Sequence, residues 1–296
     1  MLEQPLRDLD AWCRHLVQAE LPVMQDSIDE IALLAEAEEA RGNVDAHTLA
    51  QAIGGDPLMT LRVLVHVSRL CTRKGAEPPE TLTGALVMLG IAPFFRAFAD
   101  LQGLQTHLTE HPEALEGLQR TLMRARRAAH HAYHWALHRQ DEDAEIIYQA
   151  TLLHDVAELM MWCHAPRLML QVERQLAADH TLRSGDVQQA MLNVNLSDLS
   201  QALMRQWHLP GLLIEVTDDR HAEHPRVRTV MLAMRLARHT QYGWLTPNAQ
   251  AALPDDIQDI ARLLNLSNQA ALRKVQDTDL SLGLAHGGET SAQGDG

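Results

Sequence analysis

Residues 152–158 read LLHDVAE and place an adjacent histidine and aspartate inside an apolar run. Both side chains are good metal ligands, and burying either one is costly unless it is paired or bound to a metal. Neighbouring side chains on a helix point about 100° apart, so His154 and Asp155 face one ion only where the helix ends or bends. From these residues alone we favour a structural pair, in which His154 bonds Glu158 one turn further along the helix.

The composition of the whole chain predicts an all-α protein. Apolar residues make up 46% of the 296 residues and aromatic residues only 4%, and the alternation expected of β-strands is hard to find. Residues 144–163, apolar on nearly all sides, are expected to form one central helix. Asp56 followed by Pro57 is a strong signal for the start of another helix.

Charge and cysteine content exclude several classes of protein. The formal net charge is −14, which disfavours general nucleic-acid binding. Three scattered cysteines (Cys13, Cys71 and Cys163) indicate neither a zinc site nor a disulfide framework. No signal peptide or membrane span is recognisable, so we expect a soluble cytoplasmic protein.

A long helix over residues 116–139 has two distinct faces. Small apolar residues (Leu122, Ala125, Ala129, Ala132 and Ala136) recur on one side, and basic residues (Arg120, Arg124, Arg127, His131, His134 and His138) on the other. The first stripe should face the core. The arginine cluster at 124–127 could contact phosphates or an acidic partner, but we favour a solvated helix face.

Two other groups of residues are candidate ligands. His130 and His134 form an i,i+4 pair, although with 17 histidines such pairs arise by chance. Residues 218–224 concentrate acids and histidines, among them His221 and His224, and could supply a ligand to the His154–Asp155 pair. We favour a polar loop ended by Pro225.

Five segments together resemble a known family. They are LPVM at 21–24, DPLMTLRVL at 56–64, TGALVMLG at 83–90, TLLHDVA at 151–157 and QWHLP at 206–210. In this order they are similar to the HDOD domain, the HD-related output domain of bacterial signalling proteins. The resemblance covers roughly residues 20–240 and implies an all-helical, two-lobed domain related to HD phosphohydrolases.

The resemblance also implies that the metal site is incomplete. The first histidine of active HD proteins would fall near Ala125, and Met234 stands where they carry the closing aspartate. Ala157 and Glu158 replace a Gly-Lys pair, and the Gly-Tyr-Pro signature of relatives that cleave cyclic-di-GMP is absent. His130 is the one nearby residue that could restore a ligand. We therefore expect no cofactor or, if there is one, a divalent metal at the degenerate pair.

The resulting hypothesis is a non-catalytic signalling regulator that acts by binding. We expect an N-terminal helix in residues 1–20, an N-terminal lobe in 21–110, an HD-like lobe in 111–280 and a disordered tail in 281–296. A signalling protein is the expected partner, and whether the protein forms a homo-oligomer is left open. Two alternatives remain. One is a metal-dependent phosphohydrolase acting on nucleotides or cyclic dinucleotides, using ligands such as His130, His221 or His224, and the other is a sensor that binds a small molecule between the lobes.

Overall fold

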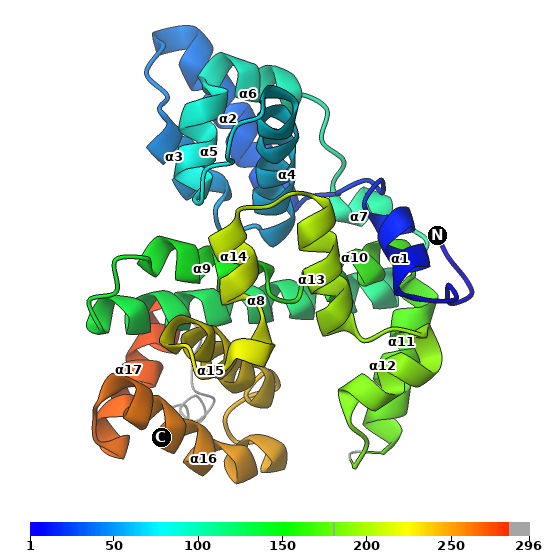
Figure 1. The fold of residues 1–296 in the computed structure, drawn as a ribbon, viewed down its shortest axis with the longest axis vertical. Helices are drawn as coiled ribbons and strands as arrows, with labels where there is room; N and C mark the ends of the chain where they lie inside the picture. The colour runs from blue at the N-terminus through cyan, green and yellow to red at the C-terminus, as the bar shows by residue number, and fades with distance from the viewer. Residues whose placement is uncertain (180, 284–296) are drawn as a thin grey trace, which may run out of the picture.

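A computed structural model describes residues 1–179 and 181–283 of the chain. Within these residues the regular structure is helical, apart from one isolated bridge between Val23 and Gly103. The predicted all-α class is confirmed. Figure 1 shows one group of helices, α2 to α6, set above a larger group built around α8. None of the described helices is long and apolar enough to span a membrane.

The upper group contains five helices and a short connecting one. They are α2 (Gln25–Arg41), α3 (Ala46–Ile53), α4 (Pro57–Lys74), α5 (Leu82–Leu89), α6 (Ile91–Ala97) and the connecting α7 (Leu104–His107). Helix α4 is central to this group because it carries its most continuous buried stripe, and it also contacts α8, α9 and α10 of the lower group.

A single buried carboxylate, that of Asp56, organises the start of α4. It accepts hydrogen bonds from the backbone N–H of Leu58 (2.9 Å) and Met59 (3.1 Å), which caps the helix as predicted. It also accepts from the backbone N–H of Met24 (2.8 Å) and the hydroxyl of Ser27 (2.9 Å). The Asp-Pro segment and the Leu-Pro segment that precedes α2 are therefore joined by one side chain.

The lower group contains the remaining helices. They are α1 (Leu9–Leu16), α8 (Pro112–His138), α9 (Ala144–Leu153), α10 (Val156–His164), α11 (Pro166–Ala178), α12 (Ser184–Leu192), α13 (Leu196–Gln206), α14 (Gly211–Val216), the 3-10 turn η1 (Asp219–His221), α15 (Pro225–His239), α16 (Pro247–Leu264) and α17 (Asn268–Ser281). Helix α1 packs on α13, and the indole N–H of Trp12 donates to the carbonyl of Leu192 (2.8 Å).

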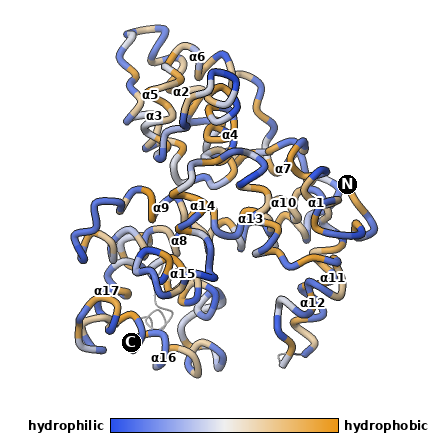
Figure 2. Tube along the Cα trace, viewed as in Figure 1, coloured by the Kyte–Doolittle hydropathy of each residue, from blue (hydrophilic) through white to orange (hydrophobic). Residues whose placement is uncertain are grey.

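Helix α8 is the axis of the lower group. It packs against α9, α10, α11, α15 and α17. Its predicted apolar stripe of Leu122, Ala125, Ala129, Ala132 and Ala136 is buried, as expected. Small side chains on this stripe let neighbouring helices approach closely. Figure 2 shows hydrophobic and hydrophilic residues alternating along most helices, as expected of helices that bury one face.

The expectation of one helix over residues 144–163 is wrong. The chain leaves the helix at His154 and Asp155, so α9 ends at Leu153 and α10 begins at Val156. Asp155 has φ −94° and ψ 30°, a bridge conformation that changes the direction of the backbone. The turn brings two adjacent side chains together that a continuous helix would direct apart.

The boundaries proposed from the sequence at residues 20, 110 and 280 stay predictions. Most of the tail that we expect to be disordered, residues 284–296, lies outside the described residues.

Removal of the Asp56 carboxylate should destabilise the fold strongly. Asp56→Ala deletes a helix cap and leaves buried donors without an acceptor, so we expect a loss of about 3 kcal/mol in the free energy of unfolding, measured by urea denaturation. The matched control is Asp45→Ala, which removes the exposed N-cap of α3 and should cost about 1 kcal/mol. Equal losses in the two variants would contradict this role for Asp56.

Candidate functional site

The His154–Asp155 pair forms the centre of a buried polar network. The Nδ1 of His154 lies 2.8 Å from Oδ1 of Asp155, and its Nε2 lies 2.9 Å from Oδ1 of Asp219. Both His154 and Asp155 are buried, whereas the Asp219 side chain is 40% exposed. Asp219 belongs to the 218–224 segment, so that loop does reach the pair, through a carboxylate and not through a histidine.

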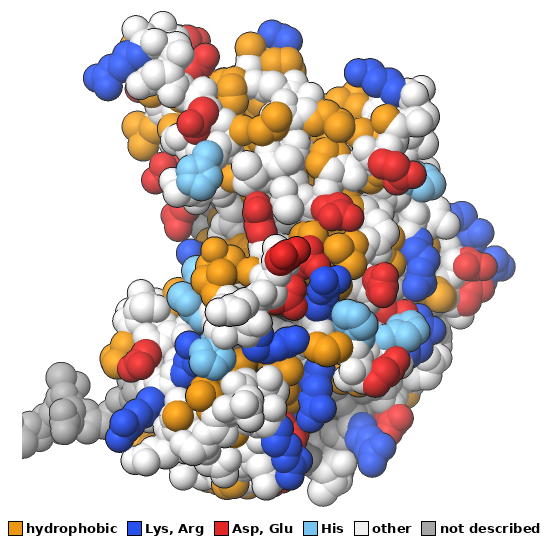
Figure 3. All heavy atoms as spheres, turned by 60° about the vertical axis from the view of Figure 1, so that its left-hand side comes forward, with side chains coloured by type: hydrophobic (Ala, Val, Ile, Leu, Met, Phe, Trp, Pro, Cys, Tyr) orange, Lys and Arg blue, Asp and Glu red, His pale blue; other side chains and the backbone are white. Residues whose placement is uncertain are grey.

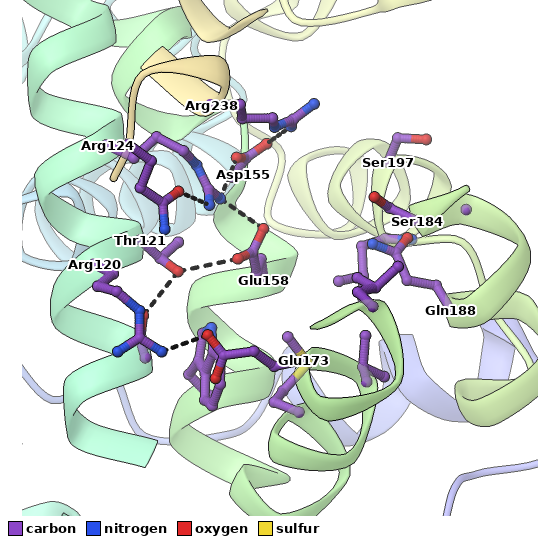
Figure 4. A pocket seen from close by; sticks show the side chains of 18 of the residues that line it. Arg120, Thr121, Arg124, Asp155, Glu158, Glu173, Ser184, Gln188, Ser197 and Arg238 are labelled. Carbon is purple, nitrogen blue, oxygen red and sulfur yellow. Dashed lines mark hydrogen bonds and ion pairs between the residues drawn. The ribbon is translucent and has the colours of Figure 1, made fainter. Parts of the chain in front are cut away.

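Two arginines from other helices complete the surroundings of Asp155. Arg124 on α8 donates from Nη2 to Oδ2 of Asp155 (2.7 Å), and Arg238 on α15 donates from Nη2 to Oδ1 (2.8 Å). Figure 4 shows both guanidinium groups turned toward this carboxylate. The Arg124 side chain is only 8% exposed, while that of Arg238 is 50% exposed. The positive charges next to Asp155 therefore come from the protein itself.

Glu158 joins this network through Arg124. Its Oε2 accepts from Nη2 of Arg124 (2.7 Å), and its Oε1 accepts from the hydroxyl of Thr121 (3.0 Å). The expected hydrogen bond between His154 and Glu158 is wrong, because both ring nitrogens of His154 already have carboxylate partners. The turn at His154 removes the i,i+4 geometry on which that expectation depended.

The contacts of the network favour the charged forms of both His154 and Asp155. Burial alone would lower the pKa of His154, but hydrogen bonds to Asp155 and Asp219 outweigh it and raise the pKa to about 9. Burial would raise the pKa of Asp155, but Arg238, Arg124 and His154 hold it well below its usual range. At neutral pH His154 is therefore an imidazolium and Asp155 an ionised carboxylate, with the guanidinium groups of Arg124 and Arg238 beside them.

These residues do not fit a divalent metal. A metal requires an imidazole nitrogen with a free lone pair, whereas Nδ1 of His154 faces Asp155 and Nε2 faces Asp219, at 2.8 and 2.9 Å. Both oxygens of Asp155 already accept charge-assisted hydrogen bonds. Within residues 1–179 and 181–283, no three histidine, cysteine or acidic side chains are grouped so that they could hold one ion.

The other candidate ligands lie away from the His154–Asp155 pair. At the two positions where active HD proteins carry a histidine and an aspartate, Ala125 and Met234 are buried apolar residues, as expected from the resemblance. His130 is partly buried and packs edge-on against Tyr148, with 5.5 Å between ring centroids. His221 and His224 are exposed, and Nδ1 of His221 lies 3.7 Å from Asp218. The structure therefore brings none of the three histidines to the His154–Asp155 pair.

The expectation of a solvated arginine face on α8 is wrong for Arg124, Arg127 and His131, all of which are buried. Arg127 makes two 2.7 Å hydrogen bonds to the carboxylate of Asp279 on α17, and Nε2 of His131 lies 3.0 Å from the same group. Arg126, by contrast, is exposed. The signal in the sequence was the i,i+3 spacing of Arg124 and Arg127 beside His131, which places them on one face, but their acidic partners are distant in sequence.

One cavity adjoins the His154–Asp155 network, and another lies apart from it. A cavity of about 690 Å³ has Arg124, Asp155 and Glu158 on one wall, and Figure 4 shows Ser184 and Gln188 on the opposite side. A second cavity of about 410 Å³ lies between the two groups of helices and is lined by residues such as Thr60, Leu82 and Tyr148. In Figure 3 the outline of the molecule narrows at the left edge, between the upper and lower parts, and histidine side chains lie near this narrowing.

The raised pKa of His154 predicts a pH dependence of stability. A folded pKa of about 9, above the ordinary 6.5, gives a stabilisation that is complete below pH 6.5 and is lost as pH rises through 9. The free energy of unfolding should therefore fall over this interval in the native protein. It should fall less in Asp219→Asn, which lacks one of the two carboxylates; identical slopes in the two proteins would contradict the assignment.

Comparisons with known proteins agree with this architecture. The family model of the HDOD domain matches residues 21–223. A solved MmoQ response regulator from Methylococcus capsulatus is 21% identical, with a TM-score of 0.64, and the match covers 86% of this chain and 98% of that one. A solved virulence factor from Campylobacter jejuni is 16% identical, with a TM-score of 0.63 and coverage of 90% and 98%. The search of curated proteins gave no match. The chain belongs to the HDOD domain family.

Proposed function

We propose that this protein is a non-catalytic regulator that acts by binding a signalling partner or a small ligand in the cytoplasm. The observation that carries the proposal is the pair of guanidinium groups, from Arg124 and Arg238, on the carboxylate of Asp155. In a metal-dependent hydrolase that carboxylate would face an ion with open coordination positions for water and phosphate. Here the protein supplies the neutralising cations.

An arginine cannot replace the chemistry of a metal. A guanidinium stays protonated at any ordinary pH and has no open coordination position, so it can neither polarise a bound water nor generate hydroxide. Arg124 is held further in this state, because burial, which lowers its pKa, is outweighed by Glu158 and Asp155. The network stabilises the junction between α9 and α10 and leaves the protein to work through its surfaces and cavities.

The comparisons support a regulatory role at a coarse level. The chain belongs to the HDOD domain family, and its resemblance to this family implies a role in signalling. One solved neighbour is named a response regulator. That name belongs to the neighbour. The division into an upper and a lower group of helices offers a cleft of about 410 Å³ between them, which is a suitable size for part of a partner or a small molecule.

The proposal predicts neither stoichiometric metal nor hydrolysis. Purified native protein and His154→Ala should contain the same low amount of iron, manganese and zinc when measured by mass spectrometry. A panel of nucleotides and cyclic dinucleotides with added Mn²⁺ should be hydrolysed no faster by the native protein than by Asp155→Ala.

Two results would contradict it. One is a stoichiometric metal that disappears in His154→Ala, and the other is hydrolysis that requires Asp155. Either result would establish the metal-dependent phosphohydrolase instead.

A further inference from the structure

We propose that the cavity of about 690 Å³ beside Asp155 binds a small organic anion, whose phosphate or carboxylate group is recognised by the hydrogen-bond donors that line the cavity, among them Arg120, Trp162 and the start of α12. The inference rests on the proposed binding function, since it gives that function a ligand class. The cavity has the size of an ordinary small-molecule site. Three features of its walls point to an oxyanion.

The first feature is a surplus of buried hydrogen-bond donors. Trp162, 3% exposed, lines the cavity, and its indole N–H has no hydrogen-bond partner. Arg124 also lines it, and the Nε of this buried side chain has no partner either. Buried polar groups without partners are uncommon and costly. Both atoms are donors, so the partner that they lack is an acceptor. Because each atom has almost no accessible surface, its side chain must turn toward the cavity to meet that acceptor.

The second feature is the N-terminus of α12 on the opposite wall. Ser184 and Gly185 begin this nine-residue helix, both line the cavity, and no side chain caps its first turn. Free backbone N–H groups and the helix dipole favour an anion at such a position. Gln188, one turn later, uses its Oε1 to accept from the backbone N–H of Leu196 (3.1 Å), which leaves its amide N–H₂ as a further donor.

The third feature is that the acidic side chains of the cavity are already neutralised. Asp155 is paired with Arg124 and Arg238, and Glu158 with Arg124. Glu173 is paired with Arg120, which lies near it in Figure 4, and Asp219 is hydrogen-bonded to His154. Arg120 meets Glu173 through Nη2, so its remaining N–H groups are available to a ligand.

The remaining wall of the cavity is apolar, and it indicates which kind of molecule carries the anionic group. Met169, Val172 and Leu176 on α11 line the same cavity and present apolar surface. A cavity of this size is too large for an inorganic ion alone. The ligand class is therefore an organic body, packed on α11, that carries one phosphate or carboxylate.

The test compares charged and neutral forms of two probes. Adenosine 5′-monophosphate is paired with adenosine, and hexanoate with hexanol, and binding is measured by titration calorimetry and by the rise in thermal midpoint. We expect at least one anionic probe to bind and its neutral counterpart not to bind. The phosphate and carboxylate arms then distinguish the two sources of the oxyanion.

Two pairs of variants locate the binding. Arg120→Gln should raise the Kd of the bound probe about tenfold, and Arg174→Gln should leave it unchanged. Arg120–Glu173 and Arg174–Glu113 are both arginine–glutamate pairs between α8 and α11, but only Arg120 lines the cavity. Trp162→Phe should raise the Kd about fivefold, and Trp135→Phe, which removes another unpartnered indole N–H outside this cavity, should not.

The inference is overturned if neither anionic probe binds at millimolar concentration, if neutral probes bind equally well, or if Arg120→Gln and Trp162→Phe both bind like their controls. Its failure is distinguishable from failure of the proposed function. Hydrolysis that requires Asp155 would overturn the function and leave the cavity as a site, whereas absence of binding would remove the ligand and leave a protein partner.

Discussion

The ion pair between Arg124 and Asp155 connects the parts of the lower group of helices. It joins the middle of α8 to the turn between α9 and α10, and Arg238 extends it to α15. A charge buried to this degree is tolerated only with a partner, and removal of one partner of such a pair commonly costs about 3–5 kcal/mol. Arg124 also donates to Glu158, and Asp155 contacts His154, which in turn contacts Asp219, so the pair is linked to the turn and to both of these acids.

A second buried network lies beside the first on α8. Arg127 follows Arg124 by three residues and binds Asp279, whose second oxygen also accepts from the indole N–H of Trp244 (3.1 Å). The first network also contains Gln241, whose Oε1 accepts from Nη1 of Arg124 (3.1 Å). It lies within residues 21–223 apart from Arg238 and Gln241, whereas Asp279 and Trp244 lie beyond them. The same face of α8 therefore carries two arginines with different partners. Arg124 binds the turn between α9 and α10, and Arg127 binds the C-terminal helix α17.

The sequence was sufficient for the features that depend on local pattern. Composition and the lack of strand-like alternation predicted the all-α class, Asp56 with Pro57 marked the start of α4, and the small residues of α8 marked its buried face. Met234 was correctly placed in an apolar environment. Each of these follows from residues within one or two turns of one another, where spacing determines which side chains share a face.

The partners within the site could not be read in the same way. Arg124 and Asp155 are 31 residues apart, Arg238 and Asp155 are 83 apart, and Arg127 and Asp279 are 152 apart. A basic residue with no acid one turn away has the same local pattern whether it faces solvent or a distant carboxylate. Nor does the apolar run at 152–158 show that the backbone turns there, because the turn is stabilised by tertiary pairing of His154 and Asp155.

A double-mutant cycle between Arg124 and Asp155 tests most directly whether the arginine is the cation of this site. The variants are Arg124→Met, Asp155→Asn and the double variant, and the quantity is the free energy of unfolding in urea. The account predicts that each single variant is strongly destabilised and that the double variant is more stable than the sum of the two losses implies by at least about 1 kcal/mol. Losses that add within about 0.5 kcal/mol would contradict it.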